Sequence, residues 1–280
     1  MERLSLKSSS GVQRHARHWL GMVCAFAAFF HTVARAEDSP DIAKQAQNPI
    51  ASLISVPFQN NTTFGVGEDS RVQNALEIEP VIPIKLTSDW NLITRTIVPV
   101  INQPTLAPGL GNVSGLGDVQ LSLYMSPVAP FHGFIWGLGP SFSFATASDR
   151  SLGTGKDSAG LSTAVLTIHG PWLVGVLVTD VASIGGREDR KNVHQFLMQP
   201  FVDYNFSHGW YLASSPIMTA DWKATSGNKW TVPVGGGGGK ILRIGRQAVN
   251  TYIQAFDDVV RSHEGGTWTL RLQVQLLFPK

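Results

Sequence analysis

The C-terminal segment TWTLRLQVQLLF (residues 267–278) gives the clearest indication of the fold, because large apolar residues occupy every second position from Trp268 to Phe278. The positions between them carry Thr269, Arg271, Gln273, Gln275 and Leu277. Side chains of a β-strand point alternately to opposite faces, so this period of two predicts a strand with one apolar and one largely polar face. In a soluble protein such a strand would be half buried. Whether this strand belongs to a membrane barrel or to a soluble protein therefore depends on whether the pattern recurs and whether the chain is exported.

The N-terminus carries an export signal. Four basic residues, Arg3, Lys7, Arg14 and Arg17, precede an apolar run over residues 19–30, which is followed by Ala-Arg-Ala at 34–36. A basic region, a short apolar region and an A-x-A site predict a signal peptide over residues 1–36, cleaved near Ala36. The run is too short to cross a bilayer as a helix. The alternative is a buried N-terminal core helix.

Cleavage would change the composition. It removes Cys24, the single cysteine, which excludes disulfides, thiol catalysis and cysteine metal sites from the mature chain. It also removes five Lys/Arg and one Asp/Glu, which leaves a formal charge of about −2, so nothing points to nucleic-acid binding. No window beyond residue 36 is long and apolar enough for a transmembrane helix, and a membrane protein with this sequence must therefore be a barrel.

The alternating pattern recurs along the mature chain. It is strong around Phe134, Phe196 and Val119, where apolar residues alternate with Ser, Gly, Gln and Asp. We expect about twelve strands, with bounds accurate to about 2–4 residues. They cover residues 51–58, 71–86, 90–101, 116–126, 133–145, 157–168, 171–183, 193–206, 209–222, 228–243, 247–260 and 267–278.

The connections between these strands alternate in length. Short turns such as 87–89, 169–170 and 207–209 alternate with longer Gly-, Ser- and Asn-rich loops such as 59–70, 102–115 and 146–156. Short periplasmic turns opposite longer extracellular loops are typical of a transmembrane barrel. An even strand number would place both chain ends on the periplasmic side.

Tryptophans cluster near the strand ends. Indole rings concentrate at membrane–water interfaces, so we predict two aromatic belts. One set follows the short turns and the other borders the opposite strand ends: Trp90, Trp136, Trp172 and Trp210, then Trp222, Trp230 and Trp268. Bulky aromatic residues that fill a soluble barrel core are the alternative.

Seven prolines fall inside the proposed strands, and five glycines follow one another at 235–239. Each proline removes a ladder hydrogen bond, so we expect bulges or bends there. The prolines are Pro80, Pro83, Pro99, Pro140, Pro200, Pro216 and Pro233. The glycine run lacks the first glycine and the Ser/Thr of a phosphate-binding loop, and indicates a bend or a close backbone approach.

These patterns predict an all-β protein, a single antiparallel up-and-down transmembrane β-barrel of about twelve strands in the bacterial outer membrane. The expected organisation is a signal peptide (1–36), a periplasmic N-terminal segment (37–50) and the barrel (51–280). The short helical pattern over residues 42–53 leaves two possibilities for the N-terminal segment, a plug inside the lumen or a free segment in the periplasm.

Several stretches resemble a known family. They are QNPIASLISVPFQNNTTFGVG (47–67), DWNLITRTIVPV (89–100), GLGDVQLSLYMSP (115–127), IWGLGP (135–140), SLGTGK (151–156), QPFVDYN (199–205), GWYLASSPI (209–217) and WTVPVGGG (230–237). The chain resembles bacterial outer-membrane "transporter" proteins grouped with the phenol meta-cleavage pathway (MetA-like) protein, some of which are mislabelled neuromedin U. The resemblance implies an outer-membrane barrel that moves small compounds, aromatic or hydrophobic ones among them, and it implies no catalytic residue.

The barrel geometry predicts a channel with a narrow, polar-lined lumen, because twelve strands enclose less space than a porin of ~16–18 strands. Its partners would be the lipid bilayer, a small solute and the barrel-assembly machinery, which would bind the last strand ending at Phe278. Charged and amide side chains of the inward parity are the candidates for lining the lumen and setting its selectivity. They are Glu77, Glu79, Lys85, Arg95, Asp203, Arg271, Gln273 and Gln275. A lumen charge that only braces the wall is the alternative for each of them.

Two other classes compete with a channel. An outer-membrane lipase or protease would need a nucleophile and base near the outer rim, where His194 and His263 lie without a G-x-S-x-G motif. No H-E-x-x-H spacing supports a metal site, and we expect no cofactor. A structural, non-conducting barrel is the third class.

Overall fold

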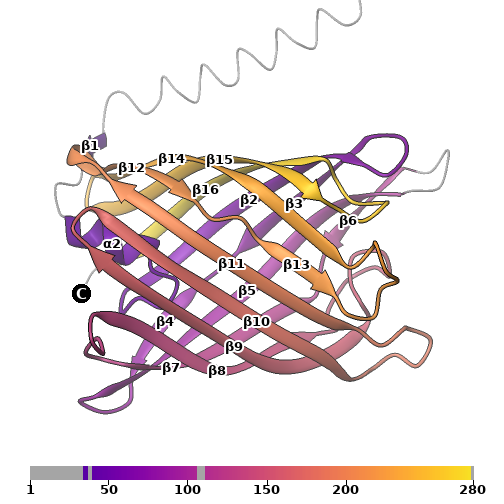
Figure 1. The fold of residues 1–280 in the computed structure, drawn as a ribbon, viewed down its shortest axis with the longest axis horizontal. Helices are drawn as coiled ribbons and strands as arrows, with labels where there is room; N and C mark the ends of the chain where they lie inside the picture. The colour runs from indigo at the N-terminus through magenta and orange to yellow at the C-terminus, as the bar shows by residue number, and fades with distance from the viewer. Residues whose placement is uncertain (1–33, 37–39, 106–110, 279–280) are drawn as a thin grey trace, which may run out of the picture.

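The chain forms a closed barrel of twelve antiparallel spans (Figure 1). A computed structural model describes residues 34–36, 40–105 and 111–278. Consecutive spans pair around the sheet, and the pairing of β14 with β15 completes the ring of hydrogen bonds. The predicted all-β, antiparallel up-and-down barrel is therefore confirmed.

Nine spans are single strands: β2 (Ile54–Val66), β5 (Trp90–Pro104), β8 (Phe134–Phe144), β9 (Lys156–His169), β10 (Trp172–Gly186), β11 (His194–Asn205), β14 (Trp230–Ile244), β15 (Gln247–Val260) and β16 (Trp268–Phe278). Three spans have two pieces: β3 (Arg71–Ile78) with β4 (Val81–Lys85), β6 (Asn112–Leu116) with β7 (Val119–Pro127), and β12 (Trp210–Ser214) with β13 (Met218–Asp221). The remaining elements are α2 (Pro40–Gln47), the 3₁₀ turn η1 (Ser207–Gly209) and β1 (Ala34–Ala36), which pairs with β14. Residues 1–33 of the predicted signal peptide lie outside the described residues.

The apolar parity of β16 faces away from the barrel axis. Leu272 and Val274 are 44% and 37% exposed, whereas Arg271 and Gln275, on the other face, are only 4% and 5% exposed. In a soluble barrel the apolar face would be the buried one. The arrangement is that of an outer-membrane barrel, in which outward residues are apolar and inward residues are polar.

Three of the seven in-strand prolines coincide with interruptions of the sheet. Pro80 separates β3 from β4, Pro216 lies between β12 and β13, and the register of β14 against β15 shifts between Val232 and Pro233. Pro83, Pro99, Pro140 and Pro200 stay within paired strands. The expected bulges and bends are thus found at some prolines and not at others.

Two predicted outer loops are wrong, because the strands continue through them. The stretch 59–70 is predicted to be a loop, but β2 runs to Val66, and in the stretch 102–115 β5 continues to Pro104 and pairs with β6 from Asn112 onward. Amide side chains replace apolar ones there: Asn60 and Asn74 exchange hydrogen bonds of 3.0 Å on neighbouring strands. Such cross-strand pairs stabilise a ladder without hydrophobic alternation.

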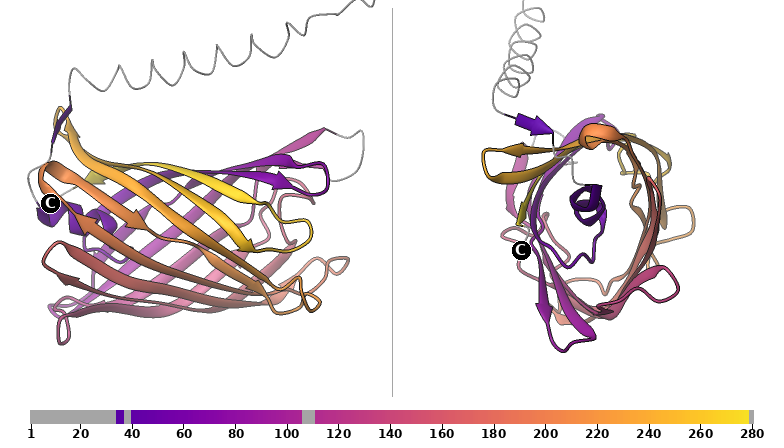
Figure 2. Two further views of the ribbon diagram at one scale, coloured as in Figure 1. Left: turned by 45° about the horizontal axis from the view of Figure 1, so that its top comes forward. Right: turned by 90° about the vertical axis from the view of Figure 1, so that its left-hand side faces the viewer.

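A segment from the N-terminus enters the barrel at the end where the short turns lie (Figure 2). Helix α2 lies within the ring of strands in the end-on view, and residues 48–53 lead from it to β2. Within the described residues no helix has the length and apolarity needed to cross a bilayer.

Candidate transport lumen

The inner wall is built largely of amide and hydroxyl side chains on β2, β15 and β16. The hydroxyl of Tyr252 lies 2.7 Å from the amide oxygen of Gln59 and 2.9 Å from that of Gln273. Asn250 donates to Gln275 at 2.9 Å. These residues meet because they occupy the inward parity of adjacent strands, where cross-strand neighbours lie side by side. The ladder gives the lumen a hydrogen-bonding surface.

Four charged side chains lie in the same part of the wall. Arg95 donates to Glu79 at 2.6 Å, and this ion pair is largely buried. Glu77 accepts hydrogen bonds of 2.9 Å from the side-chain amides of Gln59 and Asn61. Arg271 donates to the amide oxygen of the same Asn61 at 2.9 Å. A buried charge is tolerated when it is paired or hydrogen-bonded, and these contacts meet that condition.

The N-terminal segment packs against the inner wall near the turns. Ala43 and Ala46 of α2 belong to a buried apolar cluster with Tyr211 and Ile241 of the wall. Further along the segment, Ile50 is 2% exposed and joins a second buried cluster. Small residues on the helix allow a close approach, and the segment occupies part of the lumen at this end.

Amide contacts join the segment to the wall. Gln47 and Asn205 of β11 exchange two hydrogen bonds, 2.9 Å and 3.0 Å long. The glycine run of β14 also makes room here, because a Cβ on Gly239 would lie 2.3 Å from the Tyr211 ring. A close approach to the glycine backbone is thus found at Gly239, where the neighbour is a side chain, and Tyr211 uses that space to donate to Asn250 at 2.7 Å.

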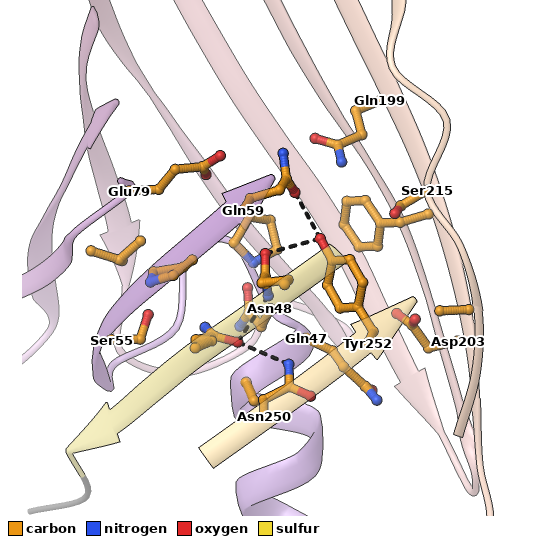
Figure 3. A pocket seen from close by; sticks show the side chains of 18 of the residues that line it. Gln47, Asn48, Ser55, Gln59, Glu79, Gln199, Asp203, Ser215, Asn250 and Tyr252 are labelled. Carbon is orange, nitrogen blue, oxygen red and sulfur yellow. Dashed lines mark hydrogen bonds between the residues drawn. The ribbon is translucent and has the colours of Figure 1, made fainter. Parts of the chain in front are cut away.

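A cavity of about 120 Å³ remains between the segment and the wall (Figure 3). Residues from the segment, β2, β4, β5, β11, β12, β15 and β16 line it. Glu79, Arg95 and Asp203 are its charged lining residues. Room for one water molecule needs about 10–15 Å³, so the cavity can hold several waters or a small solute.

Five of the eight residues predicted to line the lumen meet at this cavity: Glu79, Arg95, Asp203, Gln273 and Gln275. Glu77 and Arg271 lie on the inner wall beside it. Lys85 stands apart, exposed at the end of β4 near a short turn. Five further residues line the cavity and are not among the lumen residues predicted from the sequence: Gln199, Tyr211, Asn250, Tyr252 and Gln254. The last three alternate along β15, and that spacing could have found them.

The tryptophans lie near strand ends in aromatic groups. At the end with short turns, the rings of Trp90 and Trp136 are in T-shaped contact, with centroids 5.9 Å apart. Toward the other end, Trp222 and Trp230 are 5.5 Å apart, and Trp268 stacks on Phe64. Trp172 and Trp210 are exposed next to short turns. Their role as membrane belts stays a prediction.

His194 has an acidic partner that is not predicted from the sequence. Its Nε2 lies 2.7 Å from a carboxylate oxygen of Asp180, whose other oxygen accepts from Trp222 at 3.0 Å. Asp180 is paired with Leu161, which is 62% exposed, so the group lies on the outward face. Among the described residues no serine hydroxyl is hydrogen-bonded to His194, and no cluster of His, Cys, Asp and Glu could hold a metal.

Comparison with solved structures places the fold among outer-membrane barrels. A crystal structure of an outer membrane channel from Pseudomonas putida F1 is similar with a TM-score of 0.61 at 15% identity, covering 82% of this chain and 97% of that one. The NanC porin gives a TM-score of 0.48 at 9% identity, covering 81% and 100% of the two chains. The Salmonella typhi outer membrane phospholipase gives 0.42 at 13% identity, covering 87% and 98%. Only the first is similar enough to inform the fold. No family model and no curated protein sequence matches the chain.

Proposed function

We propose that this protein is a channel of the bacterial outer membrane that passes small compounds, aromatic or hydrophobic ones among them. The observation that carries the proposal is the inverted barrel wall, with Leu272 and Val274 exposed outside and a hydrogen-bonding lumen within. A barrel of this kind offers a polar path across hydrocarbon. The fold of the Pseudomonas putida F1 channel supports the same role.

The path is narrow, because the N-terminal segment occupies part of the lumen and leaves a cavity of about 120 Å³. A solute that passes through must be small or must displace the segment. The mixture of amide groups with the rings of Phe201 and Tyr252 suits compounds that have both an apolar body and a polar group.

Location and assembly belong to the proposal. The mature protein would begin near residue 37, cross the outer membrane with its twelve spans, and be inserted by the barrel-assembly machinery through β16, which ends at Phe278. Membership of the MetA-like transporter group rests on the quoted stretches between residues 47 and 237. Within this proposal the chain is not an enzyme and needs no cofactor.

The test is solute passage through the purified mature protein in lipid bilayers and proteoliposomes, together with solute uptake in cells with and without it. Gln199 lines the cavity, and no hydrogen bond to its side chain is found among the described residues. Gln199→Trp should therefore narrow the path and lower conductance. Val202→Trp is the matched control, because Val202 lies on the outward face of the same strand and is 40% exposed.

Two results would refute the proposal. A folded, heat-modifiable barrel that excludes every solute tried would favour a structural barrel. Lipase activity that disappears in His194→Ala would favour an enzyme, since His194 already contacts Asp180 on the outward face.

A further inference from the structure

Asp203 is a buried carboxylate without a partner. It is 6% exposed, and the strand register pairs it with the buried residues Leu173 and Ala213, so its side chain points into the lumen. It lines the cavity, as Figure 3 shows. Among the described residues no group donates a hydrogen bond to its side chain, and no Lys, Arg or His lies within ion-pair distance.

The other acids near the cavity differ from Asp203. Glu79 is paired with Arg95 at 2.6 Å, and Glu77 accepts hydrogen bonds from the amides of Gln59 and Asn61. Glu79, Arg95 and Asp203 are the charged residues that line the cavity, so its formal charge is that of one unpaired carboxylate. An isolated ionised carboxylate away from bulk water is costly unless a counter-charge reaches it.

We infer that Asp203 is the selectivity-determining residue of the lumen, and that the cavity beside it binds a small monovalent cation, inorganic or a primary ammonium. The inference rests on the proposed channel function and specifies which solutes the path prefers. A carboxylate in a narrow, weakly solvated path attracts cations and repels anions, because the field of a single charge is strong where little water screens it.

The lining of the cavity favours a monovalent ion over a divalent metal. Gln199 brings an amide group for which no hydrogen bond is found among the described residues, and the rings of Phe201 and Tyr211 also line the cavity. Carbonyl oxygens replace part of the hydration shell of an alkali ion, and aromatic faces attract ammonium groups. Calcium prefers several carboxylates, and the described residues contain no cluster of three such ligands.

The experiment measures the reversal potential of the mature protein in planar bilayers under a KCl gradient, repeated with methylammonium chloride. Wild type should prefer cations roughly threefold or more, and Asp203→Asn should bring the two permeabilities to about equal. Asp203→Glu should restore the preference. Asp89→Asn, which removes the same charge from an exposed turn, should leave it unchanged. Heat-modifiability checks that each variant is folded.

The outcomes separate the two proposals. Current without cation preference, or a preference that survives Asp203→Asn, would overturn the assignment of Asp203 and leave the channel intact. Folded protein that carries no current in any variant would overturn both. A preference for potassium without one for methylammonium, lost in Asp203→Asn, would support an inorganic cation as the occupant, and the reverse would support an ammonium.

Discussion

The two faces of the barrel wall differ in both polarity and exposure: the outward face is apolar and exposed, and the inward face is polar and largely buried. On the outward face of β16, Leu272 is 44% exposed, whereas on the inward face Gln275 is 5% exposed and accepts a hydrogen bond from Asn250. Among the described residues, every side-chain nitrogen or oxygen that is fully shielded from solvent has a hydrogen-bond partner, and Asp203, which faces the cavity, accepts no hydrogen bond. Most of the polar face thus forms its hydrogen bonds inside the barrel, and the apolar face is left for a solvent that needs no hydrogen bonds. The difference shows that the wall separates hydrocarbon from a polar interior.

The largest effect is expected from breaking the inner ion pair. Arg95→Met leaves Glu79 buried without its partner, so the free energy of unfolding should fall by about 3–5 kcal/mol. The double variant Arg95→Met/Glu79→Leu should lose less, because no uncompensated charge remains. Denaturant unfolding in lipid vesicles measures both. If the single and double variants lost the same amount, the pair would not be the source of the stability.

A charge on the outward face should have the next largest effect. Leu272→Arg places a cation against lipid and should lower the free energy of unfolding by about 2–4 kcal/mol if the site lies near the bilayer midplane. Gln199→Arg, in the wall of the cavity that Asp203 also lines, should cost much less. The same unfolding assay compares the two, and equal losses would mean that both faces meet the same environment.

A smaller loss of stability is expected when Tyr211, which packs against the N-terminal segment, loses its hydroxyl. Tyr211→Phe removes the 2.7 Å hydrogen bond to the buried side chain of Asn250, at a cost of about 1–3 kcal/mol. Tyr204→Phe is the matched control, because Tyr204 contacts Trp172 with its ring and no hydrogen bond to its hydroxyl is found among the described residues. A similar loss in both variants would count against the inward polar ladder.

The smallest effect is expected in the outer loops. Arg150 in the loop 145–155 donates a hydrogen bond to the exposed Asp189 in the loop 187–193 and so joins the two loops. This hydrogen bond lowers the pKa of Asp189. A lowered pKa means that this contact is fully present above the ordinary aspartate value of about 3.9 and is lost as the pH falls through the folded-state value. Spin-label mobility on the loops should rise in acid, and Asp189→Asn should show the same mobility at neutral pH. Glu188→Gln, at the neighbouring position, should not.

Strands whose two faces differ in polarity could be predicted from the sequence. Strand segments that are held in the sheet by pairs of amide side chains could not. Residues 267–278 and 133–145 were found within one or two residues, because apolar and small polar residues alternate there. The second half of β2, from Gln59 to Val66, is wrongly predicted as a loop, since Asn60 and Asn61 are typical loop residues until their partners on β3 and β16 are known.

The candidate site was predicted in part for the same reason. Parity along single strands located Asp203 and Gln275, which line the cavity. Two facts depend on neighbouring strands or distant segments: that Glu79 is the partner of Arg95, and that Ala46 faces the cavity from the N-terminal segment. A pattern within one strand contains no information about either.

The most direct test asks which solvent touches each face of β16. Single cysteines at Leu272 and Gln273 in the mature protein would carry a fluorophore, which is exposed in turn to nitroxide-labelled lipid and to a water-soluble quencher. We expect lipid to quench the label at position 272 strongly and the label at 273 weakly, with the reverse order for the aqueous quencher. Strong aqueous quenching at 272 with no lipid quenching would contradict the account.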